Sequence, residues 1–314
     1  MPAVSVVIPT WKGAARLQRC LEALSRQTFR DFEVIVVWNE GGNGEGIRVP
    51  TGMALRVETS ETNIGFAAAV NWGVRVAQGT CLAVLNDDAF PEPGWLEALV
   101  EEMEAGEEVG ACASLMVFDR QPDVVQSAGI AMDRAAIAWD RWRGRPVAEA
   151  RAGGEVFGAS AGAALYRRRM WEQLGGFDER FFAYLEDVEL AWRAQVAGWR
   201  CVYVPGAIVR HQGSATLGEG SPPKKILLGR NKVWLVAKNA PWEDLPLILL
   251  YDLLAVIYAI VWRRDRYPLL GRLEGLRNLR PFLAQRRPGR PRLLEPLVPP
   301  WEVPKRFMGS ALDR

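Results

Sequence analysis

Apolar stretches alternate with amphipathic stretches along the first third of the chain, as strands alternate with helices in an α/β protein. Unbroken apolar runs, or nearly unbroken ones, predict strands at VSVVIPT (4–10), FEVIVVW (32–38) and, more weakly, LRVETS (55–60). Leucines at helical spacing predict a helix over 14–24, and small apolar residues predict another over 66–77. This succession predicts a mostly parallel central sheet flanked by helices, with ligand clefts at the strand ends.

The next apolar run, CLAVL (81–85), stops on Asn86, Asp87 and Asp88. Pro91 and Pro93 prevent its continuation as a central strand, so the carboxylates are expected at the carboxyl end of the strand. Ligands bind at that edge in open α/β sheets, and carboxylates there can hold a hard divalent cation against phosphates. The alternative is a solvated turn, because Asn-Asp-Asp is also ordinary turn composition.

A second acidic pair opens a later helix. Shorter strands are expected within 109–118 and 155–168, and apolar spacing then predicts a helix from Glu186 to Ala197 that ends at Gly198. Glu186 and Asp187 fall in its first turn. A helix dipole favours acidic residues there without any catalytic role, and this alternative stays open.

The C-terminal third has a different sequence pattern, a long apolar run followed by many basic residues. Residues 245–262 form an apolar run of 18 residues broken by Asp252 and followed by the basic stretch RRDR. A spanning helix needs about 20 residues with few charges. A helix that lies in the membrane interface, or that packs on the body, is therefore expected. Seven further arginines follow: Arg272, Arg277, Arg280, Arg286, Arg287, Arg290 and Arg292.

Charge is unevenly distributed along the chain. Residues 220–314 hold 18 Lys or Arg against 8 Asp or Glu, whereas residues 1–219 hold 21 against 29. The body is therefore acidic and the C-terminal region basic, which suits an anionic partner, either a membrane surface or nucleic acid. An ordinary basic solvated face is the alternative.

Length and composition limit the number of domains and the classes of protein to which the chain can belong. At 314 residues and 49% hydrophobic content, the chain fits one large domain with an appendage, or two domains. Its four cysteines are far apart without a CxxC pair, which favours a reducing cytoplasm. The N-terminus shows no basic stretch followed by an apolar one, so secretion is not expected. Neither GxGxxG nor GxxxxGK[ST] occurs, which argues against a dinucleotide fold or a P-loop.

An ordered set of short motifs resembles family 2 glycosyltransferases with the GT-A fold, especially the bacterial rhamnosyltransferase-like branch. The set covers about residues 3–240: VSVVIPTW, FEVIVVWN, NIGFAAAVNWG, LNDDA, GASAGAALYRR, GGFDERFFAYLEDVELAWR, GW and VRHQGSAT. The resemblance implies a GT-A glycosyltransferase domain over 1–220 and a helical, basic region over 221–314. It also implies a nucleotide-diphosphate-sugar donor, a glycan or lipid-linked acceptor, a divalent cation (Mn²⁺ or Mg²⁺) and no nucleic-acid partner.

The resemblance also assigns roles to single residues. LNDDA looks like the metal-binding DxD position, so Asp88 would bind the cation, with His211 of VRHQGS as a second ligand. LEDVELAWR looks like the ED motif, so Asp187, with Glu186 beside it, would supply the catalytic base. The residues expected at the sugar nucleotide are Pro9, Thr10, Asn39, Asn63, Gly65, Asn71, Asp87, Asp88 and Gly162.

One position departs from the family pattern. Relatives have an aspartate just after the second strand that helps to bind the base, where this chain has Trp38, Asn39 and Glu40. Trp38 either stacks on the base or packs in the core. The nucleotide therefore stays open.

The function expected from these observations is metal-dependent, inverting transfer of a sugar, with rhamnose as the candidate, to a cell-envelope or lipid-linked glycan. The enzyme would work in the cytoplasm at the inner face of the membrane. One enzymatic alternative is a processive polysaccharide synthase, but the chain lacks a set of spans, and QVAGW lacks the arginine of QxxRW. A nucleotidyltransferase would open on a Gly-rich phosphate loop, absent after VVIPT. A non-catalytic sugar-nucleotide-binding protein at the membrane is the alternative from another class.

Overall fold

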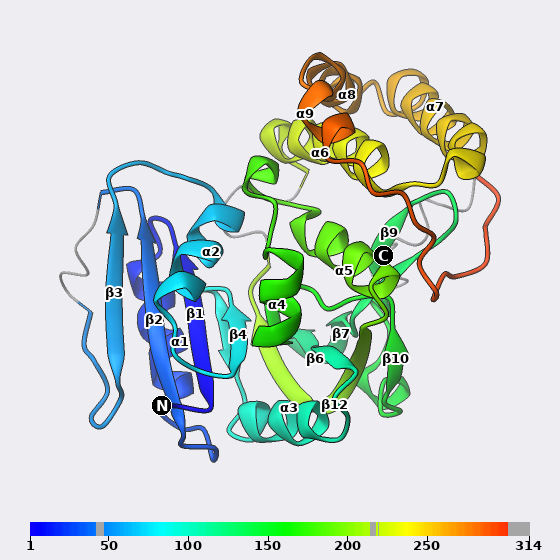
Figure 1. Cartoon of the computed structure of the whole chain (residues 1–314). Helices are drawn as coiled ribbons and strands as arrows, with labels where there is room; N and C mark the ends of the chain where they lie inside the picture. Colours follow the sequence, from blue (N-terminus) through cyan, green and yellow to red (C-terminus); the bar gives the residue numbers. More distant parts are fainter. Residues whose placement is uncertain (42–46, 214–217, 219, 301–314) are drawn as a thin grey trace.

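The computed structural model describes residues 1–41, 47–213, 218 and 220–300. The strands are β1 (Val4–Thr10), β2 (Phe32–Asn39), β3 (Leu55–Ser60), β4 (Cys81–Leu85), β5 (Ala89–Pro91), β6 (Val109–Phe118), β7 (Gln121–Ser127), β8 (Ile130–Met132), β9 (Ala138–Asp140), β10 (Gly154–Val156), β11 (Ala163–Arg167) and β12 (Arg200–His211). The α-helices are α1 (Ala14–Leu24), α2 (Phe66–Val76), α3 (Trp95–Glu104), α4 (Arg168–Leu174), α5 (Glu186–Val196), α6 (Pro222–Asn239), α7 (Leu245–Val261), α8 (Tyr267–Arg277) and α9 (Arg280–Ala284). A central sheet carries helices on both faces, and α6 to α9 form a separate group beside it (Figure 1).

The sheet order is β10-β12-β6-β11-β4-β1-β2-β3. The four strands predicted from the apolar runs form its parallel half, with β1 between β2 and β4 and β3 at the edge. In the other half, β11 runs antiparallel to both β4 and β6, so the sheet is mixed rather than parallel throughout. In the chain β11 follows β10, but in the sheet it pairs with β4 and β6. The alternation of strands and helices in the first third of the chain therefore did not reveal its direction.

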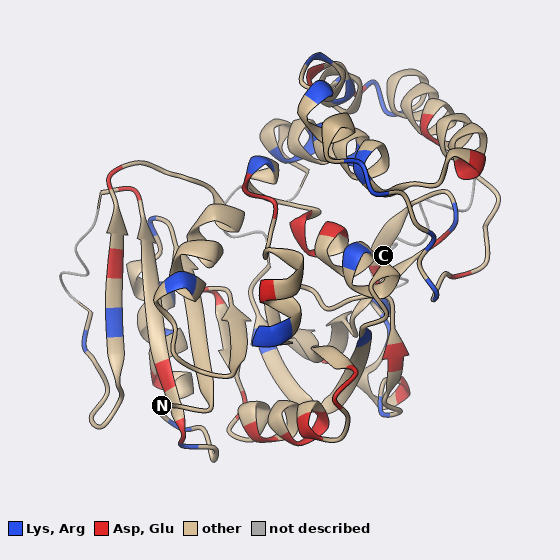
Figure 2. Cartoon of the chain, in the orientation of Figure 1, with Lys and Arg blue, Asp and Glu red and all other residues tan. Residues whose placement is uncertain are grey.

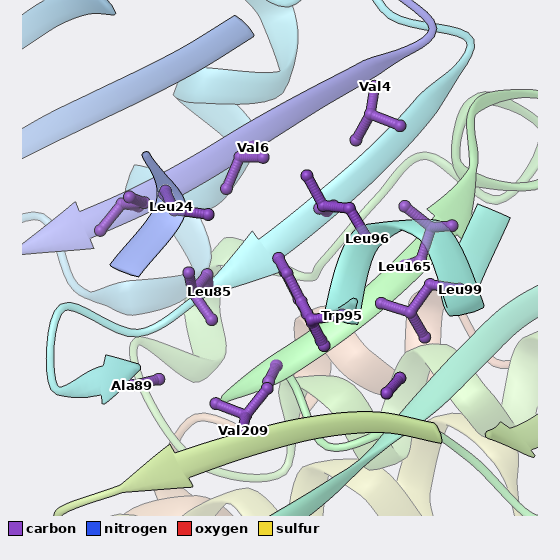
Figure 3. Packing of buried hydrophobic residues seen from close by; sticks show 14 of the residues in the cluster. Val4, Val6, Leu24, Leu85, Ala89, Trp95, Leu96, Leu99, Leu165 and Val209 are labelled. Atoms are coloured by element: carbon purple, nitrogen blue, oxygen red, sulfur yellow. The ribbon is translucent and has the colours of Figure 1, made fainter. Parts of the chain in front are cut away.

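Side chains of the central strands alternate between two hydrophobic layers. Val4, Val6 and Ile8 face one layer, into which α1 and α3 pack with Leu24, Trp95, Leu96 and Leu99 (Figure 3). Val7 faces the opposite layer, which α2, α4 and α5 cover. Because both faces are covered, the strands read as continuous apolar runs, as a buried parallel sheet requires.

Strand β12 contains a bulge at residues 205–207. Its parallel register with β6 pairs Val204 with Ser114 and then Ile208 with Leu115, so three residues of β12 have no partner. Pro205 and Gly206 occupy this irregular stretch, where a missing N–H and a missing side chain are tolerated. Beyond the bulge the strand continues to His211, which pairs with Ala89 of β5.

The C-terminal helices share a hydrophobic cluster with the body. Phe181, Val188 and Trp192 pack in one cluster with Trp234 of α6 and Phe282 of α9. Helices α6 and α8 approach closely: an added Cβ at Gly271 would lie 2.2 Å from the Ile226 carbonyl oxygen. The division between 1–220 and 221–314 stays a prediction.

The apolar run of the C-terminal region folds as helix α7, and Asp252 does not interrupt it. A helix was expected here, and the charge within the apolar run is accommodated because Arg272 of α8 pairs with the Asp252 carboxylate through two contacts of 2.6 Å. Packing of the whole helix on the body is not observed, since only Ile248 and Val256 are buried. Figure 2 shows basic residues on α8, α9 and the turn after α7, whereas α7 itself carries almost no charge.

Candidate active site

A cleft of about 700 Å³ opens at the carboxyl ends of β1, β2 and β4, the edge that the sequence predicted. Its lining continues over the end of β7, over β9, over the segment 182–188 and over the first turns of α6. Nearly all residues predicted for the site line this one cleft: Pro9, Thr10, Asn39, Asn63, Gly65, Asp87, Asp88, Gly162, Glu186, Asp187 and His211.

Asp88 and His211 form a buried pair in this cleft. Asp88 Oδ1 lies 3.0 Å from His211 Nε2. Burial opposes ionisation of Asp88, but the hydrogen bond and charge of His211 outweigh it and hold the pKa of Asp88 below its usual value. The strand β12 delivers the histidine, and the turn after β4 delivers the aspartate, so two distant parts of the chain build the pair.

Gln126 orients the histidine from the opposite side. Its Oε1 lies 2.6 Å from His211 Nδ1, and because an amide oxygen only accepts, Nδ1 donates. Nε2 lies within hydrogen-bond reach of two groups, the Asp88 carboxylate at 3.0 Å and the Asn86 amide nitrogen at 3.2 Å. It donates to Asp88 when the ring is protonated. In the neutral ring it carries a lone pair beside the carboxylate, and the two side chains could then bind one cation.

Asp88 and His211 are a pair and not a complete metal cage. Within the described ranges, no group of three or more His, Cys, Asp or Glu side chains is placed to hold a metal ion. Mg²⁺ and similar hard cations often take only one or two protein carboxylates, with waters and substrate phosphates as the other ligands. The chemistry of this pair fits a cation that is completed by a bound diphosphate.

Asp87 is tied to the first strand. Its Oδ2 accepts a hydrogen bond of 2.7 Å from Thr10 Oγ1, and Arg16 Nη2 lies 3.5 Å from the same oxygen. Burial raises the pKa of Asp87 above its usual value, and Thr10 and Arg16 oppose that rise. Asp87 thereby fixes the turn that presents Asp88.

The NIGF segment forms one wall of the cleft. Asn39 accepts a hydrogen bond of 2.7 Å from the Ile64 N–H and donates one of 3.1 Å to the Gly65 carbonyl. Asn63 Oδ1 accepts the Gly65 N–H at 3.0 Å. Gly65 has φ of 86°, and a Cβ there would lie 2.5 Å from the Phe182 ring, so both backbone angle and space require glycine.

Asn71 and Trp38 lie outside the cleft lining. The Asn71 amide donates a hydrogen bond of 2.8 Å to the Phe177 carbonyl and accepts one of 3.1 Å from the Phe177 N–H. Asn71 thus holds the segment around Phe177, which precedes the loop 182–185. Its position gives no support to the nucleotide-binding role predicted for it. Trp38 is buried in the core beside α1, which confirms packing rather than base stacking. Trp11, one residue after β1, lines the cleft instead.

Asp187 and Glu186 open α5 with different surroundings. Asp187 accepts hydrogen bonds from the N–H groups of Ala161 at 3.1 Å and of Val188 at 2.8 Å. Burial nonetheless raises its pKa to about 6. Burial and the neighbouring Asp187 raise the pKa of Glu186 well above its usual value, and Glu186 Oε2 has no hydrogen-bond partner among the described residues. Burial thus disfavours ionisation of both carboxyls, and the charge of Asp187 further disfavours ionisation of Glu186.

The segment before α5 is strained, and α6 holds it. Phe182, Tyr184 and Leu185 all have positive φ, an uncommon conformation for bulky residues. Asn231 of α6 donates hydrogen bonds to the carbonyls of Phe181, Ala183 and Tyr184 at 3.0, 2.9 and 2.7 Å. Asn231 is fully buried, so this side chain fixes the loop that presents the acidic pair.

Sequence reasoning missed several residues of the site: Trp11, Gln126, Trp139, Asp140 and Asn231. Gln126 and Asn231 act through contacts across 85 and about 50 positions of sequence, and no local spacing signals such contacts. Asp140 ends the short strand β9, and burial raises its pKa. A polar residue at a strand end, the signal used at Asn86, would have pointed to Asp140.

Comparison with known proteins decides the family. The sequence model of the glycosyl transferase family 2 matches residues 5–175. A Mycobacterium tuberculosis protein named N-acetylglucosaminyl-diphospho-decaprenol L-rhamnosyltransferase is 30% identical over 273 residues, which cover 77% of this chain and 87% of that protein. The chain belongs to glycosyl transferase family 2.

Two further comparisons agree with this membership. The O-antigen biosynthesis protein RfbC of Myxococcus xanthus is 27% identical over 261 residues, and the match spans 77% of this chain but only 20% of that protein. A Pyrobaculum calidifontis mannosyltransferase solved with GDP-Man and Mn²⁺ superposes with a TM-score of 0.53 at 21% identity, over 75% of this chain and 63% of its own. This glycosyltransferase therefore has the GT-A fold, and the family and fold that its motifs predicted are confirmed.

Proposed function

We propose that this family 2 glycosyltransferase moves a sugar from a nucleotide-diphosphate donor to a lipid-linked glycan, with a divalent cation and with inversion at the anomeric carbon. One observation carries the proposal: a carboxylate–histidine pair and a separate carboxylate with a pKa near 6 line the same cleft. The pair could hold a cation that stabilises the departing diphosphate, and the separate carboxylate could remove the proton of the acceptor hydroxyl.

The donor would lie across the strand ends. Asn39, Asn63 and Gly65 shape the wall for the nucleoside, and Trp11 offers a ring for its base. Asp88 and His211 would hold the cation, which neutralises charge on the diphosphate as the glycosidic bond breaks. Gly162 borders the same space, and a Cβ there would lie 2.8 Å from the Met116 methyl group, so larger side chains would narrow the sugar pocket.

Asp187 would act as the general base. The acceptor hydroxyl oxygen attacks the anomeric carbon from the face opposite the diphosphate, and its proton passes to Asp187. The bond from the anomeric carbon to the diphosphate oxygen breaks, and its electron pair leaves with the diphosphate. A single displacement of this kind inverts the anomeric centre and needs no enzyme nucleophile.

L-rhamnose and a lipid-diphosphate acceptor are the proposed sugar and acceptor class. The name of the mycobacterial relative, which shares the site-bearing part of the chain, supports both. An enzyme with such an acceptor would work in the cytoplasm at the inner face of the membrane.

The test is product analysis with a panel of UDP, dTDP and GDP sugars, each with and without Mn²⁺. Thermal shift first selects the nucleotide, because ligand bound to the native state raises the apparent melting temperature. We then expect Mn²⁺-dependent transfer and a product of inverted anomeric configuration by NMR. Donor binding without hydrolysis or transfer would instead support the non-catalytic binding protein.

A further inference from the structure

Helix α7 presents a broad apolar face to solvent. Only Ile248 and Val256 of the helix are buried. The exposed large side chains of the helix and the residue after it are Leu249, Leu250, Leu253, Leu254, Ile257, Tyr258, Ile260, Val261 and Trp262. Soluble monomers rarely leave so many contiguous apolar side chains uncovered, so this outer face of α7 marks an interaction surface.

The outer face of α7 is free of charge because the one charged residue within the helix turns inward. Asp252 pairs with Arg272 of α8 through two contacts of 2.6 Å. Tyr251 also faces inward and donates 2.7 Å to the Val298 carbonyl. Every polar group near the middle of the helix is therefore satisfied within the protein.

The two ends of α7 carry the residues that suit a lipid headgroup region. Trp242 precedes the helix and is 64% exposed, and Trp262 follows it and is 67% exposed. Arg263, Arg264 and Arg266, all exposed, continue the chain, and Figure 2 shows this basic turn beside the uncharged helix. Tryptophan and basic residues next to an apolar stretch are typical of segments at membrane interfaces.

We propose that α7 lies flat on an anionic bilayer, with its outer face among the upper acyl chains and the arginines at the lipid phosphates. A second copy of the chain suits the face less well, since residues 220–314 carry a net charge of +10 and two copies would bring like charges together. By length and composition, the segment Trp242–Val261 is the one described helix that could cross a membrane. Crossing would carry Asp252 into hydrocarbon or strip it of Arg272, so the in-plane position is favoured.

This surface is connected to the cleft through α6. Helix α6 packs closely on α8 at Gly271, and its Lys224 and Leu228 line the cleft. The inference rests on the proposed function in one respect: a bilayer is where a lipid-linked acceptor would be found. The binding itself requires no catalysis, so the two can fail separately.

The test is flotation of the full chain with vesicles of neutral phosphatidylcholine or of phosphatidylcholine with 30% phosphatidylglycerol, over a series of salt concentrations. We expect binding to the anionic vesicles that weakens with salt. The double variant Leu253→Asp, Ile257→Asp should bind at least tenfold more weakly, because it places charges on the inserted face. Val57→Asp, the same change at an exposed position on β3, is the matched control and should bind as the parent does.

A second pair of variants tests the electrostatic contribution to vesicle binding. Arg263→Ala, Arg264→Ala should weaken binding by about fivefold per arginine at low salt. Arg151→Ala, Arg169→Ala removes the same charge from exposed positions of the body and should change little. Quenching by brominated lipids should reach Trp242 and Trp262 in the unaltered protein and disappear in Trp242→Phe, Trp262→Phe.

Several outcomes would overturn the proposal. These are absence of binding to either vesicle, unchanged binding of the aspartate variant, and resistance to extraction at alkaline pH, which would indicate a spanning helix. A dimer in sedimentation that the aspartate variant abolishes, without vesicle binding, would assign the face to a second copy. Transfer to a lipid-diphosphate acceptor with a short, water-soluble chain is measured in parallel: its absence with intact vesicle binding would refute the proposed function and leave the membrane surface standing.

Discussion

Replacement of Asp187 by asparagine should lower activity and raise stability together. Asparagine is nearly isosteric and can still accept the Ala161 N–H, but it cannot take a proton from the acceptor. General base catalysis contributes about 10²–10⁴-fold, so kcat should fall within that range while donor affinity in the presence of Mn²⁺ changes little.

The stability gain follows from the raised pKa. The pKa of Asp187 is about 6 in the folded protein, against an ordinary value of 3.8 for an aspartate carboxyl. The folded state therefore binds the proton more tightly than the unfolded state, and the free energy of unfolding decreases as pH rises from about 4 to 6. A shift of two units corresponds to about 3 kcal/mol in full. Because the carboxylate borders the open cleft, water screens it, and we expect Asp187→Asn to stabilise by about 1–2 kcal/mol at pH 7.

The same pKa predicts the pH dependence of turnover. With an ionised base required, kcat/KM of the parent should fall about tenfold per pH unit below pH 6. The assays are transfer kinetics between pH 5 and 8 and urea unfolding at pH 7 and pH 4. The stabilisation should be present at pH 7 and lost at pH 4, where the parent carboxyl is protonated in the folded state.

Two further variants test whether Asp187, and not another carboxylate, is the general base. Asp123→Asn, an exposed position on β7, should alter neither activity nor stability. Glu186→Gln should keep most of the turnover, because the raised pKa of Glu186 favours its protonated form, which glutamine resembles. Normal turnover by Asp187→Asn, or loss of donor binding together with turnover in a folded variant, would refute the role of Asp187 as base.

Three further predictions concern the metal pair and the loop. Asp88→Ala should abolish the Mn²⁺-dependent tightening of donor binding measured by calorimetry, and His211→Ala should weaken it less because oxygen ligands remain; parent-like binding in Asp88→Ala would contradict the metal assignment. Gln126→Ala should raise the Mn²⁺ concentration for half-maximal activity about 10–100-fold, the usual loss when the partner of a histidine ligand is removed; an unchanged Mn²⁺ titration would show that Gln126 does not orient the ring. Asn231→Ala should lower kcat at least tenfold and leave donor affinity nearly unchanged, because the loop before Asp187 loses the Asn231 bonds to three carbonyls, of which that of Phe181 keeps Arg230 as a donor; equal kcat would mean that the loop holds its strained shape without Asn231.

Much of the fold could be predicted from the pattern of apolar residues. The strands at 4–10, 32–38 and 81–85 are buried along nearly their whole length and read as continuous apolar runs, whereas the helix from Glu186 buries Val188 and Trp192 at helical spacing. The apolar run at 245–262 likewise predicted the helix α7. The direction of β11 and the ion pair between Asp252 and Arg272 could not be predicted in this way, because both depend on partners distant in sequence.

The site could be predicted in outline for a related reason. Asp88 and Asp187 stand at element ends, where local sequence fixes the position of the backbone, and the cleft forms at those ends. Gln126 and Asn231 lie within elements and act only through the tertiary fold. Asn71, a polar residue in a family motif, binds the backbone of Phe177 on a neighbouring loop, and its nucleotide-binding role stays a prediction.

The bulge in β12 has a consequence for how this chain can change during evolution. Side chains alternate along a regular ladder, and between Ile208 and His211 the pairing of β12 with β6 is one to one. Loss or gain of a single residue in that stretch would turn His211 away from Asp88 without altering any other residue of the site. A change of length at 205–207 can instead be absorbed by residues that already have no partner in the ladder, so the bulge lets this segment vary in length while the histidine keeps its position.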